Sequence, residues 1–312
     1  MLEDTGFHLD YLIQAIDADS TDLFANYIGW AKIMLAKRNV PATYLASLLA
    51  SMTESSRQEL PPEFSPLACD YLEGALQRLP QMPDDLPTCL AEGTPLAALA
   101  GEYLQALLRG ERQVASQLIL DTVRRGTPVR DLYLHVFQRT QHEIGRLWQV
   151  NQISVAQEHY CTAATQLVMS QLYPYIFGGE KTHGTLVATC VAGDLHEIGA
   201  RMVCDFFEMD GWRTYYLGAN VPSPSVIQAL IKQQATVLAI SATITYHVRA
   251  VAALILAVRG TPECSGVKIL VGGYPFKVAP DLWRDIGADG SAPDAQAAIL
   301  LANCFASPPC AA

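Results

Sequence analysis

Apolar residues recur at spacings of three and four through the first part of the chain, which is the period of an amphipathic helix. The groups at 12–16 and 24–31 are the clearest. Pro41 and the proline cluster at 61–66 interrupt the pattern. We therefore predict about three helices, which together form an N-terminal helical domain at 1–78.

The segment 79–95 carries four prolines and shows little periodicity, so we predict a linker there. A second helical block follows at 96–178. Its apolar runs end on glycines, as helices often do, and Ser154 with Gln157 forms the pattern of a capping box. Short connections between successive helices predict a four-helix bundle.

From Thr185 onward the apolar pattern changes to short runs rich in β-branched and aromatic residues, separated by amphipathic stretches. This alternation predicts an α/β domain at 183–306, a Rossmann-like, doubly wound parallel sheet. The strand-like runs are TLVATCV (185–191), RTYYLG (213–218), TVLAIS (236–241) and KILVGG (268–273).

Composition narrows the classes of function. The 312 residues carry a net charge of -10 and show no basic stripe, which argues against a nucleic-acid binder. The longest apolar runs, such as 250–258, are too short to cross a bilayer, and the N-terminus lacks the pattern of a signal peptide. Eight scattered cysteines without a C-x-x-C pair fit small buried hydrophobes in a reducing compartment. We expect a cytoplasmic protein that binds neither DNA nor membranes.

The turn "GDLHEIG" (193–199) follows the first strand-like run, at the edge where open α/β sheets bind their ligands. It lacks the glycine spacing of dinucleotide or triphosphate sites. A zinc site built from Asp194, His196 and Glu197 lacks a further ligand at a convincing spacing. A helix-capping aspartate on a polar turn is the remaining alternative, so the turn alone leaves its role open.

Two later elements accompany this turn, and each falls at the end of a predicted strand. The complete set resembles the cobalamin-binding domain of methionine synthase, the mutases and their relatives, with threonine where the family usually has leucine. Its elements are D-x-H-x-x-G (Asp194, His196, Gly199), S-x-T (Ser241, Thr243) and G-G (Gly272, Gly273).

The resemblance implies a role for each of these residues. His196 would be the lower axial ligand of cobalt, since a neutral imidazole suits a transition metal, and Asp194 would orient the ring as a hydrogen-bond acceptor. Ser241 would hydrogen-bond the displaced nucleotide tail of the cofactor. The glycines 199, 272 and 273, which lack a Cβ atom, would let the backbone approach that tail closely.

The bundle carries a second arrangement, Trp148 followed after nine residues by Glu158 and His159. This resembles light-sensing cobalamin proteins of the CarH type, in which a four-helix bundle covers the upper face of adenosylcobalamin, and the resemblance spans roughly 97–305. It implies that Trp148 packs against the adenosyl group and that Glu158 and His159 contact it. The alternatives are a core tryptophan and an acid in the first turn of a helix.

The chain departs from that type at two places. Gln149 stands where the type has a histidine that captures cobalt after illumination; His142, seven residues earlier on the same helical face, or water would have to replace it. The domain at 1–78 has more acids than bases and is not a winged helix, which argues against DNA binding. This layout resembles photocobilins, which implies biliverdin as a second chromophore at 24–38, although those residues also fit an ordinary helix core.

We therefore expect a non-enzymatic photoreceptor that uses adenosylcobalamin. Its expected output is a light-dependent change of homo-oligomeric state or of contact with a signalling or enzyme partner. The alternative is a corrinoid carrier of methyl groups that serves a methyltransferase. A radical mutase is disfavoured because no barrel domain for its substrate is evident.

Overall fold

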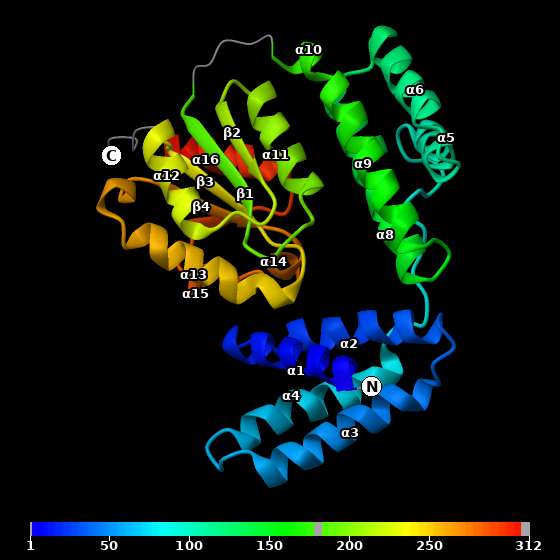
Figure 1. Ribbon diagram of the computed structural model, residues 1–312, viewed down its shortest axis with the longest axis vertical. Coiled ribbons are helices and arrows are strands. Elements are labelled where there is room, and N and C mark those ends of the chain that lie inside the picture. Colours follow the sequence, from blue (N-terminus) through cyan, green and yellow to red (C-terminus); the bar gives the residue numbers. More distant parts are fainter. Residues whose placement is uncertain (1, 178–182, 307–312) are drawn as a thin grey trace. The chain divides into compact units, whose positions relative to one another are not determined.

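The computed structural model describes residues 2–177 and 183–306 (Figure 1). The chain divides into two compact units. The first combines 1–30 and 43–82 with 180–312, and the second combines 31–42 with 83–179. The first unit therefore contains most of the N-terminal helices together with the sheet, and the second contains the bundle.

The N-terminal part holds four helices instead of the three or so predicted. The additional boundary lies between α1 and α2, where Asp19 adopts a left-handed conformation with φ of 46°. The Ser20 hydroxyl then accepts the Leu23 N–H at 3.4 Å and caps α2. The break contains neither proline nor glycine, so the apolar pattern alone did not reveal it. The helices are α1 (Leu2–Asp17), α2 (Thr21–Ala36), α3 (Ala42–Glu59) and α4 (Ser65–Arg78).

Helix α1 packs against the sheet domain within the first unit. Gln14 Oε1 accepts the backbone N–H of Arg249 at 3.2 Å, and Asp17 Oδ2 lies 3.7 Å from Arg249 Nη1. The ring of Tyr11 lies 6.4 Å from that of Tyr246. These contacts join α1 to the short helix η3 (Thr245–His247) and to α13 (Val248–Arg259).

The second unit contains the predicted four-helix bundle. Its third helix runs through α7, a π-helical turn and α8 in one continuous segment. The predicted capping box is present at the start of α9, because the Gln157 N–H donates to Ser154 Oγ and the Ser154 N–H to Gln157 Oε1. The elements from residue 79 onward are η1 (Leu79–Gln81), α5 (Ala97–Leu108), α6 (Arg112–Arg124), α7 (Val129–Leu132), η2 (Tyr133–Phe137), α8 (Gln138–Gln149), α9 (Val155–Gln171) and α10 (Tyr173–Ile176).

The irregular residues 83–95 are attached to the bundle. The Cys89 N–H donates to Glu143 Oε2 at 2.7 Å, and Glu143 Oε1 lies 2.7 Å from Arg146 Nη2. The Glu143 side chain is only 6% exposed. Burial raises the pKa of Glu143, but the hydrogen bonds from Arg146 and Cys89 lower it further, so the net shift is downward. The predicted linker is thus held by a buried carboxylate.

The sheet has five parallel strands in the order β2-β1-β3-β4-β5. All six residues of β1 are buried, as expected for a central strand covered on both faces. The prediction of a Rossmann-like, doubly wound sheet is therefore confirmed. The strands are β1 (Thr185–Cys190), β2 (Arg213–Gly218), β3 (Val237–Ser241), β4 (Lys268–Gly272) and β5 (Gly290–Ser291).

Helices cover both faces of this sheet because the chain moves from β1 to β2 on one side and then back to β3 on the other. Helix α11 packs with α16, and α12 packs with α13. The strand order reverses beside β1, so the loops after β1 and β3 border the crevice in which such folds bind ligands. The remaining helices are α11 (Ile198–Met209), α12 (Ser223–Gln233), η4 (Pro262–Cys264), α14 (Tyr274–Val278), α15 (Leu282–Asp285) and α16 (Ala295–Ala306).

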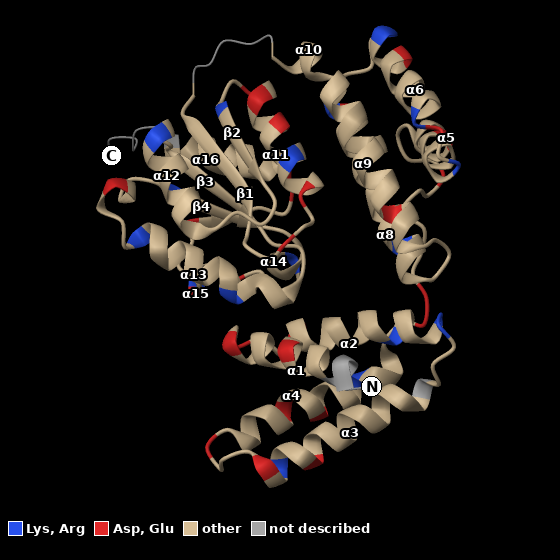
Figure 2. Cartoon of the chain, viewed as in Figure 1, with Lys and Arg blue, Asp and Glu red and all other residues tan. Residues whose placement is uncertain are grey.

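The cysteine side chains fit the expectation of small buried residues. Five cysteines are buried, Cys89 is half-buried and Cys304 is exposed, while Cys310 lies outside the described residues. Figure 2 shows Lys and Arg dispersed over many elements of the described chain. No helix among the described residues combines the length and the apolar character that a membrane span requires.

Candidate functional site

The loop after β1 buries its aspartate and exposes its histidine. Gly193 has a φ of 90°, which turns the chain sharply, and its N–H donates to Asn220 Oδ1 at 2.8 Å. The Asp194 N–H donates to the carbonyl of Val191 at 3.0 Å. Asp194 is completely buried, whereas the His196 side chain is 59% exposed. Of these two side chains, only the imidazole can meet a ligand from solvent.

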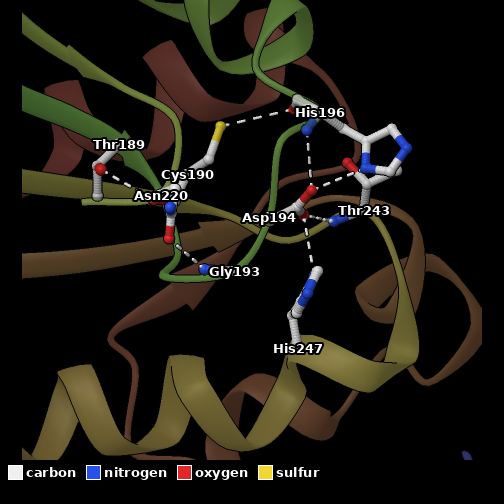
Figure 3. A network of polar contacts seen from close by, with 8 residues as sticks. All are labelled: Thr189, Cys190, Gly193, Asp194, His196, Asn220, Thr243 and His247. Atoms are coloured by element: carbon white, nitrogen blue, oxygen red, sulfur yellow. Dashed lines mark hydrogen bonds and ion pairs between the residues drawn. The ribbon is translucent and has the colours of Figure 1, made fainter. Parts of the chain in front are cut away.

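The Asp194 carboxylate gathers polar groups from two loops (Figure 3). Its Oδ1 accepts the His196 N–H at 2.9 Å and lies 2.8 Å from His196 Nδ1. Its Oδ2 accepts the Thr243 N–H at 2.6 Å and lies 3.5 Å from His247 Nδ1. The turn after β1 and the loop after β3 are therefore joined through one buried carboxylate.

This environment keeps Asp194 ionised and sets the tautomer of the neutral His196 ring. Burial raises the pKa of Asp194, but the hydrogen bond from the His196 ring, the nearby His247 ring and the hydrogen bonds from the His196 and Thr243 N–H groups lower it further, so the pKa is well below its usual range. An ionised carboxylate can only accept hydrogen bonds, so Nδ1 of a neutral His196 carries the proton and Nε2 carries the lone pair. One exposed imidazole with Nε2 as its acceptor atom fits the axial position of a corrin.

His247 is a member of this cluster that the motif did not identify. Its side chain is 9% exposed and lies at the end of η3, six residues after Ser241. A Cβ atom at Gly193 would lie 3.3 Å from His247 Nε2, so the ring occupies the space beside this glycine. The sequence does show a histidine just before an amphipathic helix. The spacing of residues does not reveal, however, that the preceding turn brings this histidine next to Asp194.

The S-x-T element contributes mainly through its main chain. Ser241 is the last residue of β3, and its carbonyl accepts the Val191 N–H at 3.0 Å. Thr243 contacts Asp194 through its backbone N–H. Because this contact does not use the side chain, threonine can occupy the position where the family usually has leucine.

The three predicted glycines differ in their surroundings. Gly273 has a φ of 112°, and a Cβ atom there would lie 1.8 Å from the carbonyl oxygen of Ala242. At Gly272 a Cβ atom would make an ordinary contact of 3.5 Å with the Ala292 carbonyl. At Gly199 it would meet nothing within 4 Å. Packing of the chain therefore requires glycine at 273, while Gly199 leaves open space beside the first turn of α11.

The predicted upper-face residues lie in the second unit. Trp148 is half-buried near the end of α8, and Glu158 and His159 lie in the first turns of α9. His159 is 75% exposed, and its Nε2 lies 3.3 Å from Glu158 Oε2. The structure thus places the three residues on consecutive helices that contact each other.

Glu158 ends a chain of hydrogen-bonded side chains between α8 and α9 that the sequence did not reveal. The Thr162 hydroxyl lies 3.3 Å from Glu158 Oε1 and 3.1 Å from Gln141 Oε1. Gln141 Nε2 in turn donates to the Thr165 hydroxyl at 2.9 Å. The Tyr103 hydroxyl also donates to Thr165, at 3.1 Å. Part of the bundle interior is therefore polar.

Two other candidate groups have surroundings that bear on their roles. Gln149 is buried, whereas His142, seven residues earlier on α8, is exposed.

In the segment 24–38, Tyr27 is buried and stacks on Tyr11 with ring centroids 3.7 Å apart. Its hydroxyl lies 2.9 Å from His8 Nδ1. The packing of Tyr27 fits the alternative of an ordinary helix core.

Two family models match the chain, and both are described as a B12 binding domain. One covers residues 184–300, which contain all the predicted lower-face residues, and the other covers residues 99–173, which contain Trp148, Glu158 and His159.

Similar proteins include a corrinoid protein, DSY3155, from Desulfitobacterium hafniense (strain Y51), which is 24% identical over 67% of this chain and 97% of that relative. Dimethylamine corrinoid protein 3 from Methanosarcina acetivorans is 32% identical over 40% of this chain, and the match spans 58% of its own length. The fold is also that of the Methanosarcina barkeri monomethylamine corrinoid protein, with a TM-score of 0.59, 22% identity and coverage of 67% of this chain and 98% of that one.

Proposed function

Because two B12-binding domains follow one another in this cobalamin-binding chain, we propose that it is a corrinoid carrier of methyl groups that serves a partner methyltransferase. The observation that carries the proposal is the exposed imidazole of His196, held at Nδ1 by the buried Asp194. The relatives named as corrinoid and dimethylamine corrinoid proteins support the carrier role.

The residues of the loop after β1 would hold the corrinoid from its lower side. When bound, the corrinoid would supply a metal centre that can carry a methyl group. His196 would bind the metal through Nε2, while Asp194 retains the Nδ1 proton and keeps the ring in one orientation. The Thr243 N–H donates to the other oxygen of that carboxylate. The loop after β3 therefore helps to hold the His196 imidazole in the orientation that would bind the metal.

Binding and coordination test the first part of the proposal. The purified protein is loaded with hydroxocobalamin, reduced to the Co(II) state and examined by electron paramagnetic resonance. With 15N-labelled histidine in the protein, we expect the doublet splitting of a 15N ligand in the wild type and its loss in His196→Ala, where only the 14N triplet of the cofactor's own benzimidazole can remain. His159→Ala, which removes an exposed histidine outside the lower site, serves as the matched control and should keep the splitting. Failure of the wild type to retain any cobalamin through gel filtration would contradict the proposal.

Methyl transfer tests the second part. The protein loaded with methylcobalamin is used to capture a methyltransferase from cells that produce the chain. Loss of the methylcobalamin absorbance when that enzyme and its acceptor are added would support the carrier role. A captured enzyme that leaves the spectrum unchanged would count against it.

A second candidate is an adenosylcobalamin photoreceptor, which the polar side chains around Glu158 favour. A ribose offers hydroxyl groups to Glu158 and the Thr162 hydroxyl, whereas a methyl group makes no use of them. Trp148 would then pack against the adenosyl group. Loading with adenosylcobalamin in darkness, followed by green light, should change the absorbance and the elution volume. If both stay the same as in the dark sample, the photoreceptor hypothesis fails.

Biliverdin as a second chromophore remains part of that candidate. It would have to bind outside the packed Tyr27, which is 8% exposed and stacked on Tyr11. Addition of biliverdin to the purified protein should produce a structured red absorption band if the segment 24–38 holds a bilin. An unchanged biliverdin spectrum excludes it.

A further inference from the structure

Arg38, just beyond the end of α2, contacts both the main chain and the ring of Trp148 within the second unit. Its Nη1 donates to the carbonyl of Gln149 at 2.9 Å, and its Nη2 donates to the carbonyl of Trp148 at 3.3 Å. Its Cζ lies 5.6 Å from the centroid of the Trp148 ring. Nη1 also donates to the carbonyl of Met34 at 3.1 Å.

These contacts have distinct physical reasons. The Trp148 carbonyl also accepts the Asn151 N–H at 3.0 Å, so Arg38 is an additional donor at the end of α8, where a cation meets the negative end of the helix dipole. The planar guanidinium suits two neighbouring carbonyls, and a cation is attracted to the face of an indole ring. One side chain therefore restrains both the position of the Trp148 backbone and the tilt of its ring.

The segment that carries Arg38 is itself fixed. Lys37 Nζ lies 2.9 Å from Asp85 Oδ2, and Lys32 Nζ lies 2.8 Å from Asp84 Oδ1. The Asn151 amide donates to the Lys37 carbonyl at 3.5 Å. Arg38 thus reaches Trp148 from a segment with contacts of its own to residues 84, 85 and 151, and its guanidinium is a restrained group.

We propose that Arg38 is a positioning residue that sets the orientation of the Trp148 indole and thereby the preference of the chain among upper axial groups of a bound cobalamin. The inference rests on the proposed function, in its second candidate, where Trp148 packs against the adenosyl group of a bound cobalamin. Arg38 acts through Trp148 and need not touch the cofactor. An indole ring held in one orientation would contact small and large axial groups differently.

The test compares affinities for hydroxo-, methyl- and adenosylcobalamin in the wild type, Arg38→Ala and Arg38→Lys. We expect the ratio of the adenosyl- to the methylcobalamin dissociation constants to change about threefold or more in Arg38→Ala, the scale of a lost cation–π contact. Arg38→Lys keeps the charge but not the two-carbonyl geometry, so its ratio should lie between the other two. Arg124→Ala, which removes an exposed arginine of α6 that pairs with Asp121, is the control and should keep the wild-type ratio.

A measurement without cofactor complements the affinities. Quenching of tryptophan fluorescence by acrylamide should increase in Arg38→Ala, and the increase should disappear when Trp148→Phe is present in both proteins. If Arg38→Ala does not fold, the same comparison is made with Arg38→Lys.

The outcomes separate the inference from the proposed function. Equal weakening of all three affinities, or an unchanged ratio with unchanged quenching, would overturn the role of Arg38 while leaving cobalamin binding intact. Absence of cobalamin binding by the wild type would contradict the proposed function, and the inference with it.

Discussion

Oδ1 of Asp194 lies 2.8 Å from Nδ1 of His196, and the two side chains differ in exposure, 0% for the carboxylate and 59% for the imidazole. The exposed group is therefore oriented by a group that no ligand can reach. Since Oδ2 is held by the Thr243 N–H, the orientation of the imidazole depends on a loop that comes 49 residues later in the chain.

Replacing Asp194 by asparagine should lower the stability of the fold and weaken the coordination of cobalt by His196. The carboxylate accepts three N–H groups, from Thr243 and twice from His196, and the amide of asparagine would set a donor against at least one of them. We expect a loss of about 1–3 kcal/mol in the free energy of unfolding. Urea denaturation measures it, and the nitrogen splitting of bound Co(II) should decrease. Asp22→Asn, at an exposed position, is the control and should change stability by less than about 0.5 kcal/mol.

Gly193 and His247 should be energetically coupled. Gly193→Ala is strained by its φ of 90° in any background, and its methyl group would also lie 3.3 Å from His247 Nε2. Removing the ring with His247→Ala relieves only the second cost. A double-mutant cycle by urea denaturation should therefore give a coupling of about 0.5–2 kcal/mol, with the double variant more stable than the sum of the two single losses. Strict additivity would show that the ring does not occupy this space in solution.

Replacement by alanine should affect cobalamin binding at Gly199 and folding at Gly273. A Cβ atom at residue 199 would meet no atom within 4 Å, and the residue lies in a helix. The free energy of unfolding of Gly199→Ala should therefore equal that of the wild type or exceed it by up to about 1 kcal/mol. Its cobalamin affinity should nevertheless fall, because the methyl group fills space left for the ligand. Gly273→Ala would place Cβ 1.8 Å from the Ala242 oxygen and should prevent stable folding. Thermal unfolding and cobalamin titration of the two variants check this contrast, which an unchanged affinity in Gly199→Ala would refute.

Glu143 should make stability depend on pH in the acid range. Its pKa in the folded protein is lowered by Arg146 and the Cys89 N–H, below the value of about 4.3 for an unfolded glutamate. Its contribution is therefore present above about pH 5 and is lost as pH falls below about 4. Glu143→Gln should be less stable than the wild type at pH 7 by about 1–3 kcal/mol, and the difference should shrink at pH 3.5. Urea denaturation of both proteins at the two pH values measures this difference. An equal difference in stability at pH 7 and pH 3.5 would exclude a contribution from the ionised Glu143 carboxylate.

Strands were easier to predict from the sequence than the helical boundaries. The run TVLAIS (236–241) became β3 (Val237–Ser241), because a short run of β-branched and apolar residues between longer amphipathic stretches is typical of a buried strand. The boundary between α1 and α2 depends on the left-handed Asp19 and the cap from Ser20. Both are ordinary residues in the sequence, and their conformation appears only in the folded turn.

The candidate site was predictable as a set of residues but not as a network. The motif spacing identified Asp194 and His196, and the structure brings them within 2.8 Å. The partner of Oδ2 is a backbone N–H, at Thr243, and no side-chain pattern encodes such a contact. His247 and Arg38 were missed for a related reason, since each reaches its partner through a turn whose direction spacing does not determine.

The contact between Gln14 and Arg249 joins residues 235 positions apart. At a synthesis rate of about 5–20 residues per second, the ribosome makes Arg249 about 10–50 s after Gln14. Helix α1 is thus complete long before the surface on which it rests exists, and the entire bundle is made in between. For that interval the apolar side of the N-terminal helices must rely on its own packing or on a chaperone, so slow translation of residues 83–249 would extend the period in which the nascent chain is most prone to aggregate.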